Sequence, residues 1–170
     1  MNEVRLPKIA RDLNDELDGL RWAFTGETAY QVYTGNTTGS NRAEAVMHLR
    51  DYGEAALRTD SETDTEVNQN GLKVFRLELE RHATPVIFRT TSLEEELGIF
   101  DRLEERDYHE TTVSLVPPEY LLAQILSGNS DNRQERLNQL RDETELDQDY
   151  LRECMRVLGI EDQILRGDTD

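Results

Sequence analysis

Acidic residues on two predicted strands are the side chains whose spacing could support metal chemistry. Two carboxylates placed two positions apart on a strand point to the same side, where their oxygens can bind Mg²⁺ together. Glu78 and Glu80 have this spacing, whereas the residue two positions after Glu44 is Val46. Glu78 and Glu80 are therefore candidates for catalysis, Glu44 is a third candidate that lacks such a partner, and the sequence assigns no metal site.

A second candidate site lies where a predicted strand gives way to a helix. The apolar run 22–25 predicts a buried strand, Gly26 ends it, and the residues from Glu27 onward predict a short helix. Exposed N–H groups at a helix start favour an anion. Gly26, Glu27 and Thr28 are therefore the candidate ligand-binding residues.

An alternation of helices and strands must position these residues. Apolar residues at spacings of three and four predict helices over 6–20, 27–33, 52–57 and 92–103 and through most of 118–165; apolar runs predict strands over 22–25, 43–49, 72–79, 85–88 and 112–116. Residues 59–70 are predicted to form a loop, and Ser92 with Glu95 to form a capping box. The order predicts a mixed α/β fold with a mixed sheet, an α/β core over 1–116 and a C-terminal helical lobe over 117–170.

The net charge of the chain is strongly negative. Against 36 Asp and Glu stand 19 Lys and Arg, of which only Lys8 and Lys73 are lysines, and the net charge is -17. At molar salt the Debye length falls to ~3 Å, so most of the self-repulsion of such a chain disappears. The acid-rich, lysine-poor, threonine-rich composition resembles that of proteins from extreme halophiles. We interpret the acidity as an adaptation to the solvent.

The composition also limits which binding partners and which cellular compartment we expect. A charge of -17 argues against DNA binding, which needs clustered Lys and Arg; RNA is left open, because an arginine patch formed by folding is not visible in a sequence. Cys154 is the single cysteine, so no internal disulfide is expected and a reducing cytoplasm fits. No apolar stretch is long enough to cross a bilayer, and the charged N-terminus lacks a signal-peptide core. We expect a cytoplasmic protein with no membrane partner.

Three runs of residues, taken in order, carry a resemblance to a known family. They are Leu-Arg-Trp-Ala-Phe-Thr-Gly over 20–26, Val-Ser-Leu-Val-Pro-Pro-Glu-Tyr-Leu-Leu over 113–122 and Leu-Asp-Gln-Asp-Tyr-Leu over 146–151. The chain resembles the minimal nucleotidyltransferases and the related abortive-infection type toxin nucleotidyltransferases. The resemblance implies a nucleotidyltransferase-like fold, a glycine turn that holds nucleotide phosphates, and acidic residues on two strands that bind Mg²⁺.

The chain departs from the family pattern at each chemical position. Glu27 stands where the family has a second small residue, Val46 replaces the second carboxylate after Glu44, and residues 84–90 contain no acid. One hypothesis is that the Glu27 carboxylate itself occupies the phosphate position; the alternative is an ordinary acidic residue at a helix start. The resemblance therefore implies a catalytically degenerate member that needs no cofactor.

Three functions are compatible with these residues. The first is a pseudoenzyme that acts by binding, as a regulator or as one half of a toxin–antitoxin pair, for which a protein partner is expected. The second is an active nucleotidyltransferase that uses Mg²⁺ to modify RNA or protein. The third is a non-catalytic interaction domain. The missing carboxylate partner of Glu44 favours the first over the second.

Overall fold

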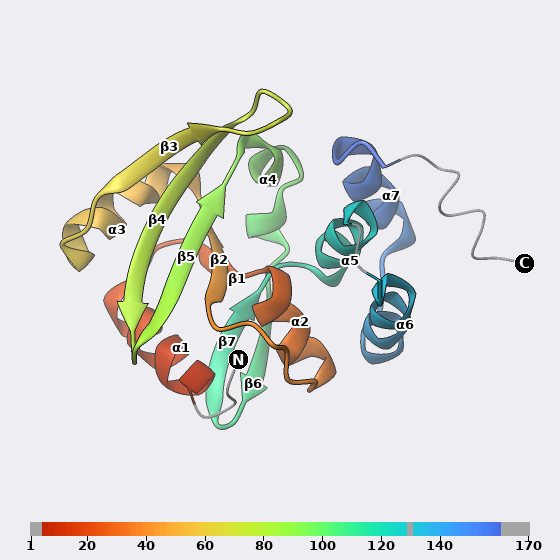
Figure 1. Ribbon diagram of the computed structural model, residues 1–170, viewed down its shortest axis with the longest axis horizontal. Helices are drawn as coiled ribbons and strands as arrows, with labels where there is room; N and C mark the ends of the chain where they lie inside the picture. Colours follow the sequence, from red (N-terminus) through yellow and green to blue (C-terminus); the bar gives the residue numbers. More distant parts are fainter. Residues whose placement is uncertain (1–4, 129–130, 161–170) are drawn as a thin grey trace, which may run out of the picture.

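The computed structural model describes residues 5–128 and 131–160, and a seven-stranded mixed sheet lies at its centre (Figure 1). The strand order is β3-β4-β5-β2-β1-β7-β6. β1 runs parallel to β7 and β2 parallel to β5, whereas the other neighbours are antiparallel. The strands span Trp22–Phe24 (β1), Ala43–Met47 (β2), Thr63–Val67 (β3), Lys73–Arg81 (β4), Thr84–Thr90 (β5), Glu104–Tyr108 (β6) and Thr111–Leu115 (β7).

The first three helices contact the sheet, and the last three gather at one end of it (Figure 1). α1 contacts β7, α3 contacts β3 and β4, and α2 contacts β2. α5 contacts both α6 and α7. α2 contacts α5 and α6 as well as β2, so α2 connects the C-terminal helices to the sheet. The helices span Arg5–Glu16 (α1), Gly26–Thr34 (α2), Tyr52–Thr59 (α3), Ser92–Glu96 (α4), Pro118–Ser127 (α5), Arg133–Glu143 (α6) and Gln148–Val157 (α7).

Along β4, one face of the sheet is apolar and belongs to the core. Successive residues of a strand point to opposite faces, so Leu77 and Leu79 lie on the buried face of β4 and Arg76 and Glu78 on the other. Leu77 pairs with Phe88 of β5, which is fully buried, so the apolar face continues across both strands. The opposite face carries the polar side chains of β4 and β5, and the candidate site lies there.

The expected mixed α/β class is confirmed, but the pattern of the sequence misses two strands. β3 lies inside the predicted loop 59–70, and β6 begins at Glu104, directly after the predicted helix 92–103. Both strands are at the outer edges of the sheet, where polar residues predominate, so they lack the alternating apolar signal of a half-buried strand. α4 ends early because Gly98, with a φ of 63°, adopts a left-handed conformation.

The capping box of α4 begins one residue earlier than predicted. Thr91 Oγ1 accepts a hydrogen bond from the Leu93 N–H (3.1 Å), and Glu94 Oε2 accepts one from the Thr91 N–H (2.8 Å). Ser92 and Glu95 therefore do not form the predicted box.

The C-terminal helices are described only in part. The predicted helical residues 161–165 lie outside the described residues. Among the helices in residues 5–128 and 131–160, none combines the length and apolar character needed to cross a bilayer.

Candidate functional site

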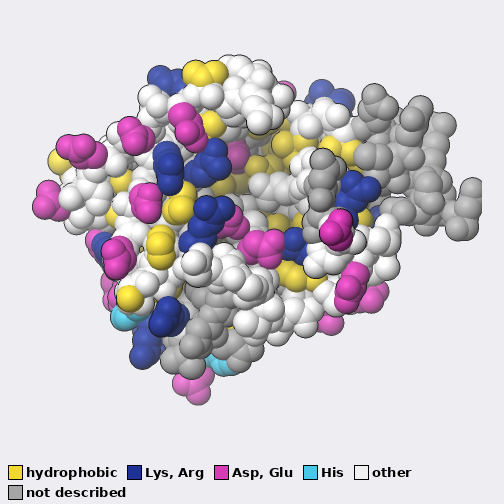
Figure 2. All heavy atoms as spheres, in the orientation of Figure 1, with side chains coloured by type: hydrophobic (Ala, Val, Ile, Leu, Met, Phe, Trp, Pro, Cys, Tyr) yellow, Lys and Arg dark blue, Asp and Glu magenta, His cyan; other side chains and the backbone are white. Residues whose placement is uncertain are grey.

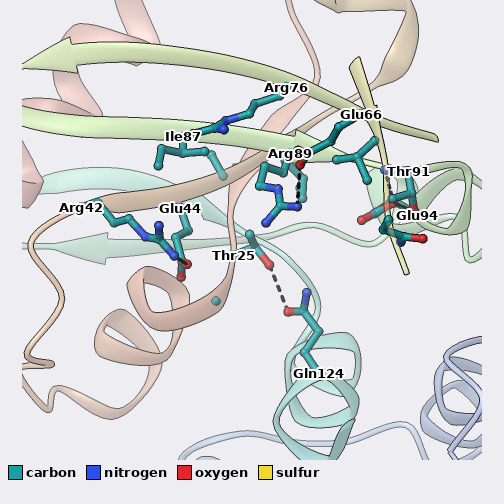
Figure 3. A pocket seen from close by; sticks show the side chains of 15 residues that line it. Thr25, Arg42, Glu44, Glu66, Arg76, Ile87, Arg89, Thr91, Glu94 and Gln124 are labelled. Atoms are coloured by element: carbon teal, nitrogen blue, oxygen red, sulfur yellow. Dashed lines mark hydrogen bonds and ion pairs between the residues drawn. The ribbon is translucent and has the colours of Figure 1, made fainter. Parts of the chain in front are cut away.

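A cleft of about 420 Å³ opens on the polar face of the sheet (Figure 3). Its walls come from β2, β3, β4 and β5, from the start of α2, and from α4 and α5. Figure 2 shows Lys and Arg side chains grouped over the middle of this face, with Asp and Glu between them. In Figure 3 the side chain of Arg89 projects into the centre of the cleft, between Glu66 and Thr25.

The register of the strands explains why these side chains share one face. Glu44 of β2 pairs with Ile87 of β5, and Ile87 pairs with Glu78 of β4. Arg89 pairs with Arg76 in the same way. Because directly opposed residues point to the same side of a sheet, the two arginines and the two glutamates all face the open side.

The carboxylate of Glu44 lies at the start of α2. Its Oε2 accepts a hydrogen bond from the Glu27 N–H (2.9 Å), and its Oε1 lies 3.3 Å from Nη2 of Arg42. A Cβ added to Gly26 would collide with Oε2 of Glu44, so the lack of a side chain there makes room for this contact. Thr28 holds β2 beside the helix, because its Oγ1 accepts a hydrogen bond from the Glu44 N–H (3.0 Å).

The side chain of Glu27 points away from this position. Its Oε1 lies 2.7 Å from Nη2 of Arg136 on α6, where the ion pair joins α2 to the C-terminal helices. The hypothesis that the Glu27 carboxylate occupies the anion position of α2 is therefore wrong, because the carboxylate at that position belongs to another residue. Glu44, from the neighbouring strand, supplies that carboxylate.

Arg76 and Arg89 form the cationic side of the cleft. Arg89 Nη2 lies 3.0 Å from Glu66 Oε1, and Arg76 Nη2 lies 3.1 Å from Glu78 Oε2. The Nε of Arg76 is buried and has no hydrogen-bond partner among the described residues. The open face of β4 and β5 therefore presents two guanidinium groups, neither of which is among the candidate site residues predicted from the sequence.

Hydrogen bonds join α5 to the N-cap residue of α2 and to α4 at one wall of the cleft. Thr25 Oγ1 donates to Gln124 Oε1 (3.1 Å), and the Tyr120 hydroxyl donates to Glu94 Oε1 (3.0 Å). Burial, together with the neighbouring Glu94 carboxylate, raises the pKa of Tyr120 well above its ordinary value. Tyr120 therefore stays protonated and can donate this hydrogen bond, which ties α5 to α4.

Comparison with solved structures identifies the architecture. An antigenic nucleotidyltransferase-like protein from Paracoccidioides brasiliensis matches with a TM-score of 0.57 and 14% identity, over 97% of this chain and 89% of its own. A candidate nucleotidyltransferase from Thermotoga maritima matches with a TM-score of 0.51 and 15% identity, over 81% and 93% of the two chains. The antibiotic-resistance factor ANT(2'')-Ia matches with a TM-score of 0.54 and 11% identity, over 95% and 91%.

The fold is nucleotidyltransferase-like. At identities this low the likeness concerns the fold alone. No protein-family model matches the sequence, and no curated protein matches it either.

The side chains of the cleft do not fit the Mg²⁺ ions that a nucleotidyltransferase-like fold implies. Val46, two positions after Glu44, offers no oxygen, and Ile87 stands beside Glu44 on β5. Arg89 follows two positions later and would repel a cation. Mg²⁺ needs several oxygen ligands at about 2.1 Å in an octahedral arrangement. Glu44 cannot supply them by itself, and the other two carboxylates of the cleft are engaged elsewhere, Glu66 by Arg89 and Glu94 by the Thr91 N–H and the Tyr120 hydroxyl.

The pair Glu78 and Glu80 does not complete such a site. β5 separates β4 from β2, so the backbones at Glu44 and Glu78 are two strand spacings apart, about 10 Å. Glu78 pairs instead with Arg76, and Glu80 lies further along β4, opposite Pro85. Across residues 5–128 and 131–160 there is no group of three or more His, Cys, Asp or Glu side chains that could hold a metal ion.

Some residues of the cleft are predictable from the sequence, and others are not. The strand-to-helix pattern indicates Gly26 and Thr28, and the structure adds Glu44, a separate candidate in the sequence, to them at the start of α2. Arg76 and Arg89 are missed because their proximity depends on the register of β4 against β5. The alternation within β4 does contain a usable signal, since it places Arg76 on the same face as Glu78.

Proposed function

We propose that this protein is a nucleotidyltransferase-fold pseudoenzyme that acts by binding a ligand in the cleft. The observation that carries the proposal is the set of residues around Glu44. Val46 on β2 and Ile87 and Arg89 on β5 face the cleft, and none of them can bind a divalent cation. The fold is retained, whereas the ligands that metal-dependent transfer requires are replaced.

The chemistry of nucleotide transfer explains why this replacement matters. Such transfer relies on metal ions that align the attacking and leaving oxygens and neutralise the developing charge. Glu44 is already engaged by the Glu27 N–H and by Arg42. Recruiting Glu44 to a metal would remove the carboxylate that satisfies the first turn of α2.

A protein partner is part of this proposal, within a regulatory or toxin–antitoxin pair. Two large apolar side chains support it, because Leu57 is 79% exposed and Val67 is 71% exposed. Val67 ends β3, an outer strand of the sheet, and outer strands readily add a strand from another chain.

Labelled nucleoside triphosphates test the proposal. The protein is incubated in high salt with Mg²⁺ or Mn²⁺, alone and with RNA, and we expect both protein and RNA to stay unlabelled. Robust labelling that is lost in Glu78→Gln or Glu80→Gln would overturn the proposal and place an active site on β4. Labelling lost in Glu44→Gln would overturn it equally, with the active site on β2.

A further inference from the structure

Two arginines stand directly opposite each other on neighbouring strands of a very acidic protein. Arg76 of β4 pairs with Arg89 of β5, and both line the cleft. Like charges directly opposed across two strands destabilise a sheet. The chain has 36 acidic and 19 basic residues, so this pair of cations runs against its general composition. An anion bound between the two guanidinium groups would relieve their repulsion.

The carboxylates already present leave most of the donors of these arginines available. A guanidinium group carries five N–H donors, and the contacts to Glu66 and Glu78 each use Nη2 alone. Both carboxylates are about half exposed, at 51% and 53%. Ion pairs between exposed groups contribute little and are screened by salt. A more highly charged oxyanion can therefore compete with them.

The buried Nε of Arg76 is a second, independent indication of a ligand. It has no hydrogen-bond partner among the described residues, although buried N–H groups in proteins are nearly always satisfied. An arginine presents its N–H groups as a planar fork that matches two oxygens of a phosphate. Because this Nε is shielded from solvent, a phosphate oxygen would supply the missing acceptor once the Arg76 side chain turns toward the open cleft.

We propose that Arg76 and Arg89 bind the phosphate groups of a small phosphorylated molecule without a divalent cation, with Arg42 as a third cation at the edge of the cleft. This inference rests on the proposed function, because it gives the ligand of a cleft that binds and does not transfer. The volume of about 420 Å³ is in the range of sites for small molecules. The guanidinium groups provide the positive charge that metal ions would otherwise provide.

Calorimetric titration in EDTA tests this binding. Pyrophosphate and a nucleoside triphosphate are titrated separately, at the lowest KCl concentration at which circular dichroism shows native structure. We expect pyrophosphate to bind, and Arg76→Gln and Arg89→Gln each to weaken binding about tenfold or more, since each removes charged hydrogen bonds. Arg152→Gln is the matched control, because Arg152 is an exposed arginine on α7 paired with Asp149. It should bind as the unmodified protein does.

The two ligands distinguish the source of the phosphate. Binding of both supports a site for phosphate groups as such, and binding of the triphosphate alone supports phosphate groups carried on a nucleoside. Failure of both to bind, binding that requires Mg²⁺, or equal weakening in Arg152→Gln would each overturn the inference. Melting temperatures of all the variants establish that they fold, which the exposure of Arg89 (56%) leads us to expect.

The outcomes for the two proposals can be separated. If neither ligand binds and no label is transferred, only the arginine site fails. If label is transferred to protein or RNA, the proposed function fails, whatever pyrophosphate does.

Discussion

The backbone N–H of Glu27 donates a hydrogen bond of 2.9 Å to Oε2 of Glu44, across the join between α2 and β2. A side chain from the sheet thus satisfies a donor in the first turn of the helix, a role that the N-cap residue Thr25 does not fill with its own side chain. The start of α2 is therefore already in contact with a carboxylate before any ligand enters the cleft.

Gly26→Ala should destabilise the protein. The new Cβ would collide with the Glu44 carboxylate, and Gly26 has a φ of +56°, which costs a residue with a side chain about 1–2 kcal/mol. Urea denaturation measures the loss. Gly53→Ala in α3 is the control, because a Cβ there meets no atom within 4 Å, and it should be neutral or stabilising. A Gly26→Ala variant as stable as the unmodified protein would contradict the contact between Gly26 and Glu44.

Glu44→Gln should strengthen pyrophosphate binding severalfold. The change removes a negative charge from the cleft while keeping the size of the side chain. Glu27→Ser should leave the affinity unchanged, since its carboxylate is paired with Arg136 on α6. Titration calorimetry in EDTA compares the two variants. Stronger binding in Glu27→Ser than in Glu44→Gln would show that the assignment of the two carboxylates is reversed.

Folding should depend on salt. The charge of -17 destabilises the compact state through self-repulsion, and salt at roughly molar concentration shortens the range of that repulsion to ~3 Å. Circular dichroism across a series of KCl concentrations should show structure lost below this range. Full native structure and an unchanged melting temperature at ~0.1 M would contradict the halophile interpretation.

Stability should fall as the pH rises above about 9. Burial raises the pKa of the Cys154 thiol from 9.0 to about 12 and raises the pKa of Tyr120 well above 10.0. The folded state therefore keeps protons that the unfolded state releases, and stabilisation present below the unfolded pKa is lost as the pH approaches the folded value. Urea denaturation at several pH values measures this loss.

Cys154→Ala is the control for the alkaline loss, because it removes one of the groups responsible. Its free energy of unfolding should decline less steeply with pH than that of the unmodified protein. An identical slope would mean that the thiol does not contribute. The same burial predicts that the native protein reacts slowly with iodoacetamide, which attacks through the thiolate.

The central elements of the fold are predictable from sequence because their signals are local. The apolar run 22–25 followed by Gly26 predicts β1 and the start of α2, and the Pro-Pro pair at 117–118 predicts the start of α5. β3 and β6 are not predictable in this way, because an outer strand needs no apolar face. The capping box is misplaced by one residue because Thr91 and Ser92 are both good caps and Glu94 and Glu95 both follow at suitable spacing.

The candidate site is less predictable than the fold. Glu44 is singled out by its residue type and by its strand, but its contact with the Glu27 N–H depends on how β2 packs beside α2. The opposition of Arg76 and Arg89 depends on a register between strands that a turn at His82 and Ala83 sets. Both residues there have positive φ values, 53° and 57°, and the residue types His and Ala do not predict such a conformation.

The cations that line the cleft are all arginines, at positions 42, 76 and 89. A guanidinium group is more weakly hydrated than an ammonium group and keeps its proton at every pH at which proteins fold. Less water must be stripped from it when an anion arrives. In a brine, where dissolved ions compete for water, a cleft lined by arginine would keep its charge, and the desolvation cost of binding an anion there would stay low.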